Sequence, residues 1–328
     1  MKSKFFKIIV GVFILANLGM AEYVKKDNAV YYKYSEEDDS EFKVENVDLN
    51  TFKILNDKYA KDDKSVYFSG NKSFEDVDSK TFEVLPQYYS RDKNNVYRPI
   101  NEWIHKINGA NPKTIKVLNE FYSKDDKNVY AAVDIIKDAD PQTFRRIPET
   151  NYARDKNNLY YYFGDVKNLG KINEKDFKVL DSNLVKNGNE VYYLGEKVNI
   201  KNPEKFEIIE NYLSSPSMVV YGKDDKNVYV MTPYKEAGYL KIIKNADKDT
   251  FEVMENSDYS KDRNNVYYAG YNVVQLQDVD KNSFAIGEEN GFSYDKKNVY
   301  YAGRKLNDIS SAGFKVTRLV NRPNSPIN

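Results

Sequence analysis

The stretch RDKNNVY at residues 91–97 returns as RDKNNLY at 154–160 and as KDRNNVY at 261–267, and looser copies occur along the chain. Each copy ends in an aliphatic residue followed by Tyr, and such positions recur along the chain at the regular spacing of a repeat architecture. A repeat unit this short cannot bury a core alone, so neighbouring repeats are expected to stack. The aliphatic residues of the nine copies are Val30, Val66, Val96, Val129, Leu159, Val191, Val228, Val266 and Val299.

The residues around each copy predict a β-hairpin. Seven positions before the aliphatic residue stands an aromatic residue in eight copies, as at Tyr59, while Leu184 takes this place in the sixth copy. A polar segment with Lys or Arg and then Asp separates two short runs rich in Tyr, Val and Phe, which is the pattern of a hairpin. The sixth copy replaces the Asp by Asn187-Gly188, a strong hairpin signal. We therefore expect the Asp to have a conformational role.

Pairing of the two runs about this turn fixes which side chains face each other. The small residue after the first aromatic, such as Ala60, should lie opposite the recurring Tyr, such as Tyr67. The first aromatic should lie opposite the residue after that Tyr, for example Tyr161. We expect such pairing to let the rings lie flat and interdigitate. Both faces of each hairpin carry apolar groups, so neighbouring repeats should cover them.

A second signature lies between the hairpins, for example DSKTFEVL at 78–85 and NPKTIKVL at 111–118, and its ninth copy is SSAGFKV at 310–316. It begins with Asp, Asn or Ser, the residue types that cap a helix N-terminus. The alternation that follows has the period of a strand. We predict one capped helical turn that leads into a short strand, with the Phe in the core. A Gly shortly after the recurring Tyr, such as Gly70 or Gly195, indicates a second turn.

Together these patterns predict an all-β chain, a tandem and solenoid-like array of about nine short hairpin or meander units with one capped helical turn each. A β-propeller is the alternative, although the repeat is shorter than the roughly 40 residues or more of a four-stranded blade. The repeats occupy residues 22–317 as a single repeat domain, and the Pro and Asn residues of 318–328 indicate a loose C-terminal tail.

The motif quoted above resembles that of the DKNYY repeat family of bacterial exported proteins, and the resemblance extends over residues 23–317. It implies an exported bacterial repeat protein, and it implies no reaction mechanism and no catalytic residues.

Residues 1–21 have the pattern of a signal peptide. Three Lys precede an apolar run at residues 8–16, and Gly19 and Ala21 are the small residues before a cut at Glu22. An uncleaved membrane anchor is the alternative, although the run is too short to span a bilayer comfortably. We expect an exported protein, in the periplasm or at the cell surface, with no membrane span after cleavage.

The composition limits the chemistry. There is no Cys and only one His, His105, which excludes disulfides, thiol catalysis and a multi-His metal site within the chain. Basic and acidic residues balance at 50 each, so no basic excess favours nucleic acid. The Asp-rich turns lack the converging oxygen ligands of a calcium loop, and no Gly-rich phosphate loop occurs. We therefore predict no metal, no cofactor and no catalytic residues.

Function more often lies where repeats depart from their own pattern. Three segments do so: residues 98–110, with the only Trp and the only His, residues 211–220, and residues 231–244. Trp103 and His105 are two positions apart and would share a face on a strand. They and Tyr234 are the candidate ligand-binding residues. The alternative is a longer strand pair with a packed Trp and a surface His.

Two functions follow from the sequence. The first is a non-enzymatic binding or structural scaffold, with an envelope glycan or a surface protein as its partner. The second is a hydrolase of cell-envelope polymers that takes its carboxylates from different repeats. The acidic residues recur with the repeat, which is typical of turns and solvated edges, and this favours the scaffold.

Overall fold

The structure is a computed structural model and describes residues 22–34, 40–72, 76–101, 103–210, 219–255, 257–287 and 291–311. The predicted signal peptide, the C-terminal tail and residues 211–218 of the second departing segment lie outside the described residues. The chain divides into two compact parts, Met1–Arg145 and Arg146–Asn328, and each is described by itself.

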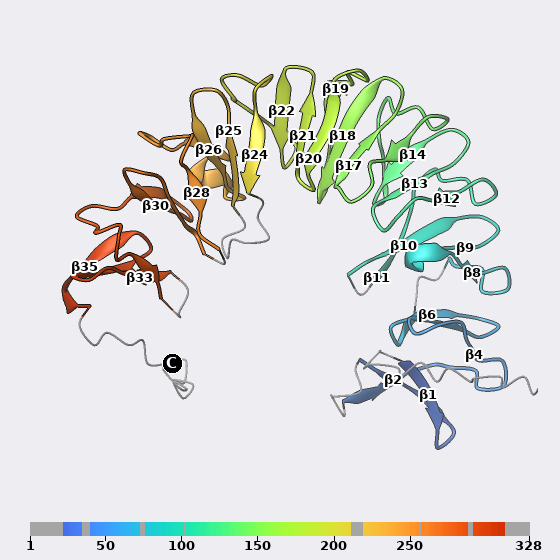
Figure 1. The fold of residues 1–328 in the computed structure, drawn as a ribbon. Coiled ribbons are helices and arrows are strands. Elements are labelled where there is room, and N and C mark those ends of the chain that lie inside the picture. Colours follow the sequence, from blue (N-terminus) through green and yellow to red (C-terminus); the bar gives the residue numbers. More distant parts are fainter. Residues whose placement is uncertain are drawn as a thin grey trace, which may run out of the picture. The chain divides into compact units, whose positions relative to one another are not determined.

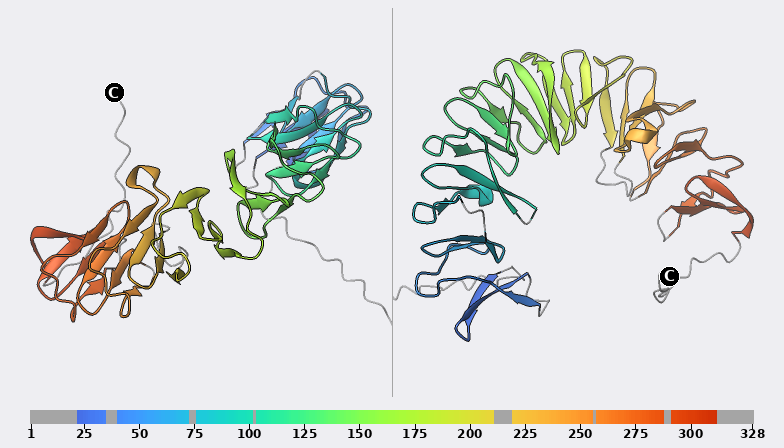
Figure 2. Two further views of the ribbon diagram at one scale, coloured as in Figure 1. Left: turned by 90° about the horizontal axis from the view of Figure 1, so that it is seen from above. Right: turned by 180° about the vertical axis from the view of Figure 1, so that it is seen from behind.

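Nine small antiparallel sheets follow one another in chain order, four in the N-terminal part and five in the C-terminal part, with the division falling inside β16 (Figure 1). The first sheet has three strands and the others have four each. No sheet of the described chain closes into a barrel. The predicted all-β tandem array is therefore confirmed, and both views in Figure 2 show the succession of sheets within each part.

The N-terminal part contains sheets 1 to 4. Sheet 1 is β1 (Glu22–Lys26), β2 (Ala29–Lys33) and β3 (Glu41–Lys43); sheet 2 is β4 (Lys53–Ile54), β5 (Tyr59–Lys61), β6 (Val66–Phe68) and β7 (Asn71–Lys72). Sheet 3 is β8 (Glu83–Val84), β9 (Ser90–Arg91), β10 (Val96–Ile100) and β11 (Trp103–Lys106), with the 3-10 helix η1 (Pro86–Tyr88); sheet 4 is β12 (Lys116–Val117), β13 (Tyr122–Lys124), β14 (Val129–Ala131) and β15 (Asp134–Ile135).

The C-terminal part contains sheets 5 to 9. Sheet 5 is β16 (Arg145–Arg146), β17 (Tyr152–Arg154), β18 (Asn158–Phe163) and β19 (Asp165–Lys171); sheet 6 is β20 (Phe177–Asp181), β21 (Leu184–Asn187), β22 (Glu190–Tyr193) and β23 (Glu196–Val198). Sheet 7 is β24 (Glu207–Glu210), β25 (Val220–Lys223), β26 (Val228–Met231) and β27 (Leu240–Ile242), with the 3-10 helix η3 (Lys235–Ala237). Sheet 8 is β28 (Glu252–Val253), β29 (Tyr259–Lys261), β30 (Val266–Ala269) and β31 (Val273–Gln275); sheet 9 is β32 (Ala285–Ile286), β33 (Phe292–Tyr294), β34 (Asn298–Tyr301) and β35 (Arg304–Ser310).

The predicted hairpin pairing is confirmed. Ala60 lies opposite Tyr67, and Tyr152 lies opposite Tyr161. The expectation that the rings lie flat is wrong, because the aromatic pairs meet tilted or edge-on, with 56° between the rings of Tyr152 and Tyr161. Edge-on contact places the positive ring edge against the negative face of the neighbouring ring.

The turns of the first eight copies form where they were predicted, and the structure fixes the sheet to which each belongs. The ninth predicted copy, at residues 310–316, lies mostly outside the described residues. The carboxylate of Asp78 accepts hydrogen bonds from the N–H groups of Lys80 and Thr81, as an N-cap does. The strand that follows, β8, pairs with the next hairpin of the chain through β9. A structural repeat therefore runs from the capped turn through the short strand and the hairpin to a fourth strand.

Tyrosine hydroxyls tie consecutive sheets together. The Tyr that starts a hairpin, named the first Tyr here, has a buried ring, and in five of the described hairpins its hydroxyl is hydrogen-bonded to the backbone of the next sheet in the chain. Tyr259, for example, donates to the carbonyl of Gly291 at 2.9 Å and accepts from the N–H of Gly303. Four other first tyrosines donate in the same way: Tyr23 to Lys58, Tyr59 to Tyr88, Tyr152 to Asn183 and Tyr221 to Asp258.

The basic residue that precedes the Asp of the hairpin makes a second link in the N-terminal part. The amine of Lys61 donates to the carbonyls of Ser79 and Phe82, which belong to the capped turn of the next repeat. Lys124 donates in the same way to Pro141 and Phe144, and Arg91 donates to Pro112. Cations suit these carbonyls, because the free C=O groups at the end of a helical turn carry partial negative charge.

The hydroxyl links predict that Tyr259→Phe lowers the free energy of unfolding by about 1–2 kcal/mol, since the change leaves the ring in place but removes both hydrogen bonds. Chemical denaturation measures the loss. Tyr271→Phe is the matched control, because Tyr271 is exposed, and it should change stability by less than about 0.5 kcal/mol. Equal stability of the two variants would contradict the assignment.

Candidate functional site

The strands of each sheet are connected at two opposite sides of the sheet, and these sides differ in character. They are called edges here, a term that does not refer to the edge strands. The hairpin turn and the capped turn share one edge, named the Asp-turn edge, where the N–H of Asp48 in the capped turn donates to Asp62 in the hairpin turn. Because successive strands run antiparallel, the other two connections of each sheet meet at the opposite edge, named the loop edge. There the N–H of Ser69 donates to the carbonyl of Lys58, and the N–H of Leu194 donates to that of Asn183.

A buried carboxylate organises the Asp-turn edge. One oxygen of Asp62, Oδ1, accepts the N–H groups of Lys64 and Ser65 inside the turn. The other oxygen, Oδ2, accepts the N–H of Asp48 and the hydroxyl of Tyr67, at 2.9 and 2.8 Å. The tyrosine five positions after the Asp donates to it in seven repeats, at 2.6 to 3.0 Å: Tyr67, Tyr97, Tyr130, Tyr160, Tyr229, Tyr267 and Tyr300.

The hydrogen bonds decide the charge of these carboxylates. Burial by itself would raise the pKa of Asp295, but donors from Asp280, Lys297 and Asn298 outweigh it and lower the pKa to about 2. The same balance lowers the pKa of Asp62 and of Asp262. Burial and the neighbouring Asp224 carboxylate raise the pKa of Tyr229 to about 12, so this tyrosine stays a neutral donor. The expected conformational role of the Asp is borne out by these contacts.

The sixth repeat holds its hairpin turn against its capped turn without an Asp carboxylate. Asn187 accepts the N–H of Asn173 through its side-chain oxygen, as Asp62 accepts that of Asp48, and its amide donates to the carbonyl of Lys171. The hydroxyl of Tyr192 donates to Glu190 instead. In this repeat an amide therefore takes over the contact with the capped turn, and a glutamate accepts the hydrogen bond of the tyrosine.

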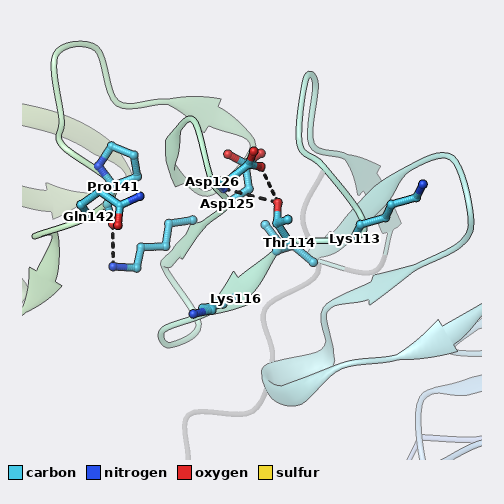
Figure 3. Close-up of a pocket in the computed structure, with 9 residues that line it drawn as sticks. Lys113, Thr114, Lys116, Asp125, Asp126, Pro141 and Gln142 are labelled. Carbon is cyan, nitrogen blue, oxygen red and sulfur yellow. Dashed lines mark hydrogen bonds between the residues drawn. The ribbon is translucent and has the colours of Figure 1, made fainter.

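A pocket of about 510 Å³ opens at the Asp-turn edge of sheet 4 (Figure 3). Its carboxylates and its most buried amine serve the fold: Asp125 accepts from the hydroxyl of Tyr130, Asp126 accepts from Thr114 at 2.5 Å, and Lys124 donates to Pro141. Burial, together with repulsion from Lys116, lowers the pKa of Lys124. Asp125, Asp126 and Lys124 are thus engaged in contacts that hold the hairpin turn of sheet 4 to its own capped turn and to the next one.

The segments that depart from the repeat belong to the loop edge. Residues 98–110 extend β10 and β11 and their connection, and residues 231–244 lengthen the connection from β26 to β27. The remaining segment, residues 211–220, lies mostly outside the described residues, between the end of β24 and the start of β25, which are both at this edge of sheet 7. The Asp-turn edge repeats and the loop edge varies, so the loop edge is the candidate functional surface.

Trp103 and His105 lie on one face of β11, as predicted, with the buried Ile104 between them. Trp103 is 58% exposed, so the alternative of a packed Trp is wrong. Residues opposite each other on antiparallel strands share a face, which adds Ile100, opposite Trp103, and Arg98, opposite His105. The guanidinium of Arg98 lies over the ring of Tyr89 at 5.6 Å.

Tyr234 lies in the long β26–β27 connection, and its ring contacts that of Tyr271 on sheet 8 at 5.6 Å. Lys241 donates to the carbonyl of Tyr271 and holds the two sheets together here. Tyr234 belongs to the C-terminal part, whereas Trp103 and His105 belong to the N-terminal part. Each is therefore assigned to the loop edge of its own sheet.

Sequence reasoning missed two exposed rings at the loop edge. Phe163, at the tip of β18, is 78% exposed, and Tyr271, in the turn between β30 and β31, is 52% exposed. Length and composition were the available signals for Phe163, since the segment YYYFG has one more residue before its Gly than YYLG or YYAG, and all four of those residues are aromatic. Exposed apolar groups of this size mark interaction sites when they gather on one surface.

The described residues contain neither a group of metal ligands nor a membrane-spanning helix. Among them, no three His, Cys, Asp or Glu side chains are grouped so that they could hold a metal ion. No helix of the described chain is long and apolar enough to cross a membrane.

Comparison with known proteins gives one family. A sequence model of the DKNYY family matches residues 23–164 and 197–271, and the interruption coincides with the sixth hairpin. No curated protein matches the chain. Among solved structures, the crystal structure of the extracellular domain of a protein described as a putative one component system from B. thetaiotaomicron is 10% identical, with a TM-score of 0.17. The match covers 87% of this chain and 44% of that one, and its TM-score supports no argument about fold or function.

The carboxylate network predicts that Asp62→Asn lowers the free energy of unfolding by about 1–3 kcal/mol. Either orientation of the new amide places its nitrogen against backbone N–H donors, that of Asp48 or those of Lys64 and Ser65. Asp63→Asn is the matched control, since Asp63 is the next residue of the same turn and is exposed, and it should have little effect. Denaturant titration distinguishes them. An Asp62→Asn variant as stable as wild type would show that the carboxylate network is dispensable.

The lowered pKa values predict loss of stability in acid. The folded-state pKa of Asp295 is about 2 and the unfolded value is about 3.9, so the unfolded chain binds more protons between these values. The contribution of the ionised Asp295 to the free energy of unfolding is complete above about pH 4 and is lost as the pH falls through about 2. It amounts to about 2 kcal/mol. Unfolding free energies measured from about pH 5 to about pH 2 should fall steadily. In Asp295→Asn the slope should be shallower, and an unchanged slope would refute the assignment.

Proposed function

We propose that this chain, which belongs to the DKNYY family, is a non-enzymatic exported repeat protein that serves as a binding scaffold in the periplasm or at the cell surface. The export proposal rests on the pattern of residues 1–21. The binding proposal rests on the loop edge, and the partner we propose is an envelope glycan or a protein of the cell surface.

The exposure of Trp103 is the observation that carries the proposal. A tryptophan that is 58% exposed leaves most of a large apolar ring in water, which disfavours the free state and is relieved when a partner covers it. Trp and Tyr dominate binding energies because they supply much rigid contact area at low entropic cost. Further exposed rings at the loop edges of their own sheets are Tyr34 and Tyr88 in the N-terminal part, and Phe163 and Tyr271 in the C-terminal part.

The recurring acidic residues favour binding over hydrolysis. A hydrolase needs a carboxylate that is free to exchange a proton with its substrate. Asp62, a buried Asp of this kind, accepts four hydrogen bonds, and its lowered pKa keeps the carboxylate ionised. These groups are therefore suited to holding the turn and not to acid catalysis.

Co-sedimentation with purified peptidoglycan sacculi tests the binding proposal, with a membrane-protein fraction as a second arm. Trp103→Ala should weaken retention about tenfold or more in the arm that contains the partner, since truncation of a central aromatic residue costs about 2 kcal/mol or more. Ile54→Ala is the matched control, because Ile54 is an exposed apolar residue of β4 in the same part of the chain, and it should bind like wild type.

The same experiment distinguishes the hydrolase. Release of soluble glycan or peptide fragments from the sacculi, abolished by a single Asp or Glu substitution, would refute a non-enzymatic role. Equal retention of wild type and Trp103→Ala in both arms would refute binding through the loop edge around Trp103.

A further inference from the structure

The basic residue of the hairpin has different cross-strand partners in different repeats. In sheets 3, 7 and 8 it forms an ion pair with a glutamate that lies opposite it on the preceding strand: Arg91 with Glu83, Lys223 with Glu207 at 3.4 Å, and Lys261 with Glu252 at 2.9 Å. In sheet 4 the residue opposite Lys124 is Lys116. Because like charges directly opposite each other destabilise a sheet, this position lacks the acid that balances it in the other three sheets.

The amines of Lys116 and Lys124 are only partly engaged. Lys124 donates to the carbonyls of Pro141 and Phe144 at 2.7 and 3.0 Å, and its third N–H has no acceptor among the described residues. Lys116 is exposed, and no acid of the described chain forms an ion pair with it. Burial and then repulsion from Lys116 lower the pKa of Lys124 by more than the attraction of Asp140 raises it. An anion beside both amines would relieve this repulsion.

Both lysines line the pocket at the Asp-turn edge of sheet 4 (Figure 3). The volume of about 510 Å³ is in the range of small-molecule sites. Ile115 and Pro141 give the pocket apolar lining, and the amide of Gln142 is a further hydrogen-bond donor. Lys113 also lines it, but Figure 3 shows its side chain directed away from that of Lys116. The pocket therefore has room for a small molecule whose negative group lies beside Lys116 and Lys124.

The carboxylates of the pocket are held by donors of their own. Asp125 accepts four hydrogen bonds, from Asn111, Lys127, Asn128 and Tyr130. Asp126 accepts the hydroxyl of Thr114 at 2.5 Å and the side-chain amide of Asn111 at 3.0 Å. Figure 3 shows both carboxylates beside Thr114, with the side chain of Lys116 directed away from them. The positive charge that lacks a partner acid thus lies at Lys116, next to Lys124.

We propose that this pocket binds a phosphate group, as free phosphate or as a small phosphate ester, between the amines of Lys116 and Lys124. A phosphate monoester carries about −1.5 to −2 charge near pH 7, so one group balances both amines, whereas one carboxylate balances a single amine. The amine of lysine acts as a point charge and binds phosphate without the planar fork that arginine offers to carboxylates. The site is at the Asp-turn edge and does not depend on the binding proposed for the loop edge.

Calorimetric titration of the full chain at constant ionic strength tests the proposal, with glycerol phosphate in one arm and inorganic phosphate in the other. Wild type should bind, and the tighter arm identifies the source of the phosphate group. Lys116→Glu introduces the glutamate of sheets 3, 7 and 8 and should weaken binding at least about tenfold, because its carboxylate pairs with Lys124 and repels the phosphate. Without phosphate its thermal midpoint should be no lower than that of wild type, which shows that the fold is retained.

Lys53→Glu is the matched control. Lys53 is exposed and lies opposite Lys61, whose amine also donates to two carbonyls of the next capped turn, but Lys53 does not line the pocket. This variant has the same change of net charge and should bind glycerol phosphate like wild type. Three results would each overturn the proposal: no binding by wild type in either arm, equal weakening in the two variants, or equal affinity of wild type for acetate.

Discussion

The structure depends on a buried negative charge that is stabilised by N–H and O–H donors. In each Asp hairpin the Asp is between 0% and 7% exposed, and turn amides and the tyrosine five positions later satisfy its carboxylate, as at Asp62. In most of these repeats it also accepts an amide of the capped turn, which joins three segments of one repeat at a single side chain. Burial of a charge is tolerated only when such donors replace water.

This arrangement gives the two edges of a sheet different roles. The Asp-turn edge is occupied by contacts within and between repeats, so a substitution there disturbs several hydrogen bonds at once. The connections at the loop edge carry fewer constraints, and they differ in length from the short turn at Ser69-Gly70 to the connection that contains η3. A scaffold that separates its framework from its variable surface can change its binding properties without losing its fold.

The strand pairing within each hairpin could be predicted from the sequence, whereas the hydrogen bonds between repeats could not. The alternation around Val66 and Tyr67 determined the pairing of the hairpin, because strand partners about a short turn follow from register alone. The hydroxyl of Tyr259 and the amine of Lys61 could not be assigned, because their acceptors lie in another repeat of the chain. The face shared by Trp103 and His105 was predictable from strand period, whereas the exposure of Trp103 depends on which neighbours cover it.

The hydrogen bonds between repeats join neighbours in the chain, and this affects how the array folds and how it can evolve. Even the hydroxyl bond between Tyr23 and Gly70 joins one repeat to the next, so the network needs no closure of long loops. Folding can therefore begin at any adjacent pair of repeats and spread along the array. For the same reason, whole repeats can be duplicated or deleted in frame during evolution, since each new joint reproduces contacts that already exist.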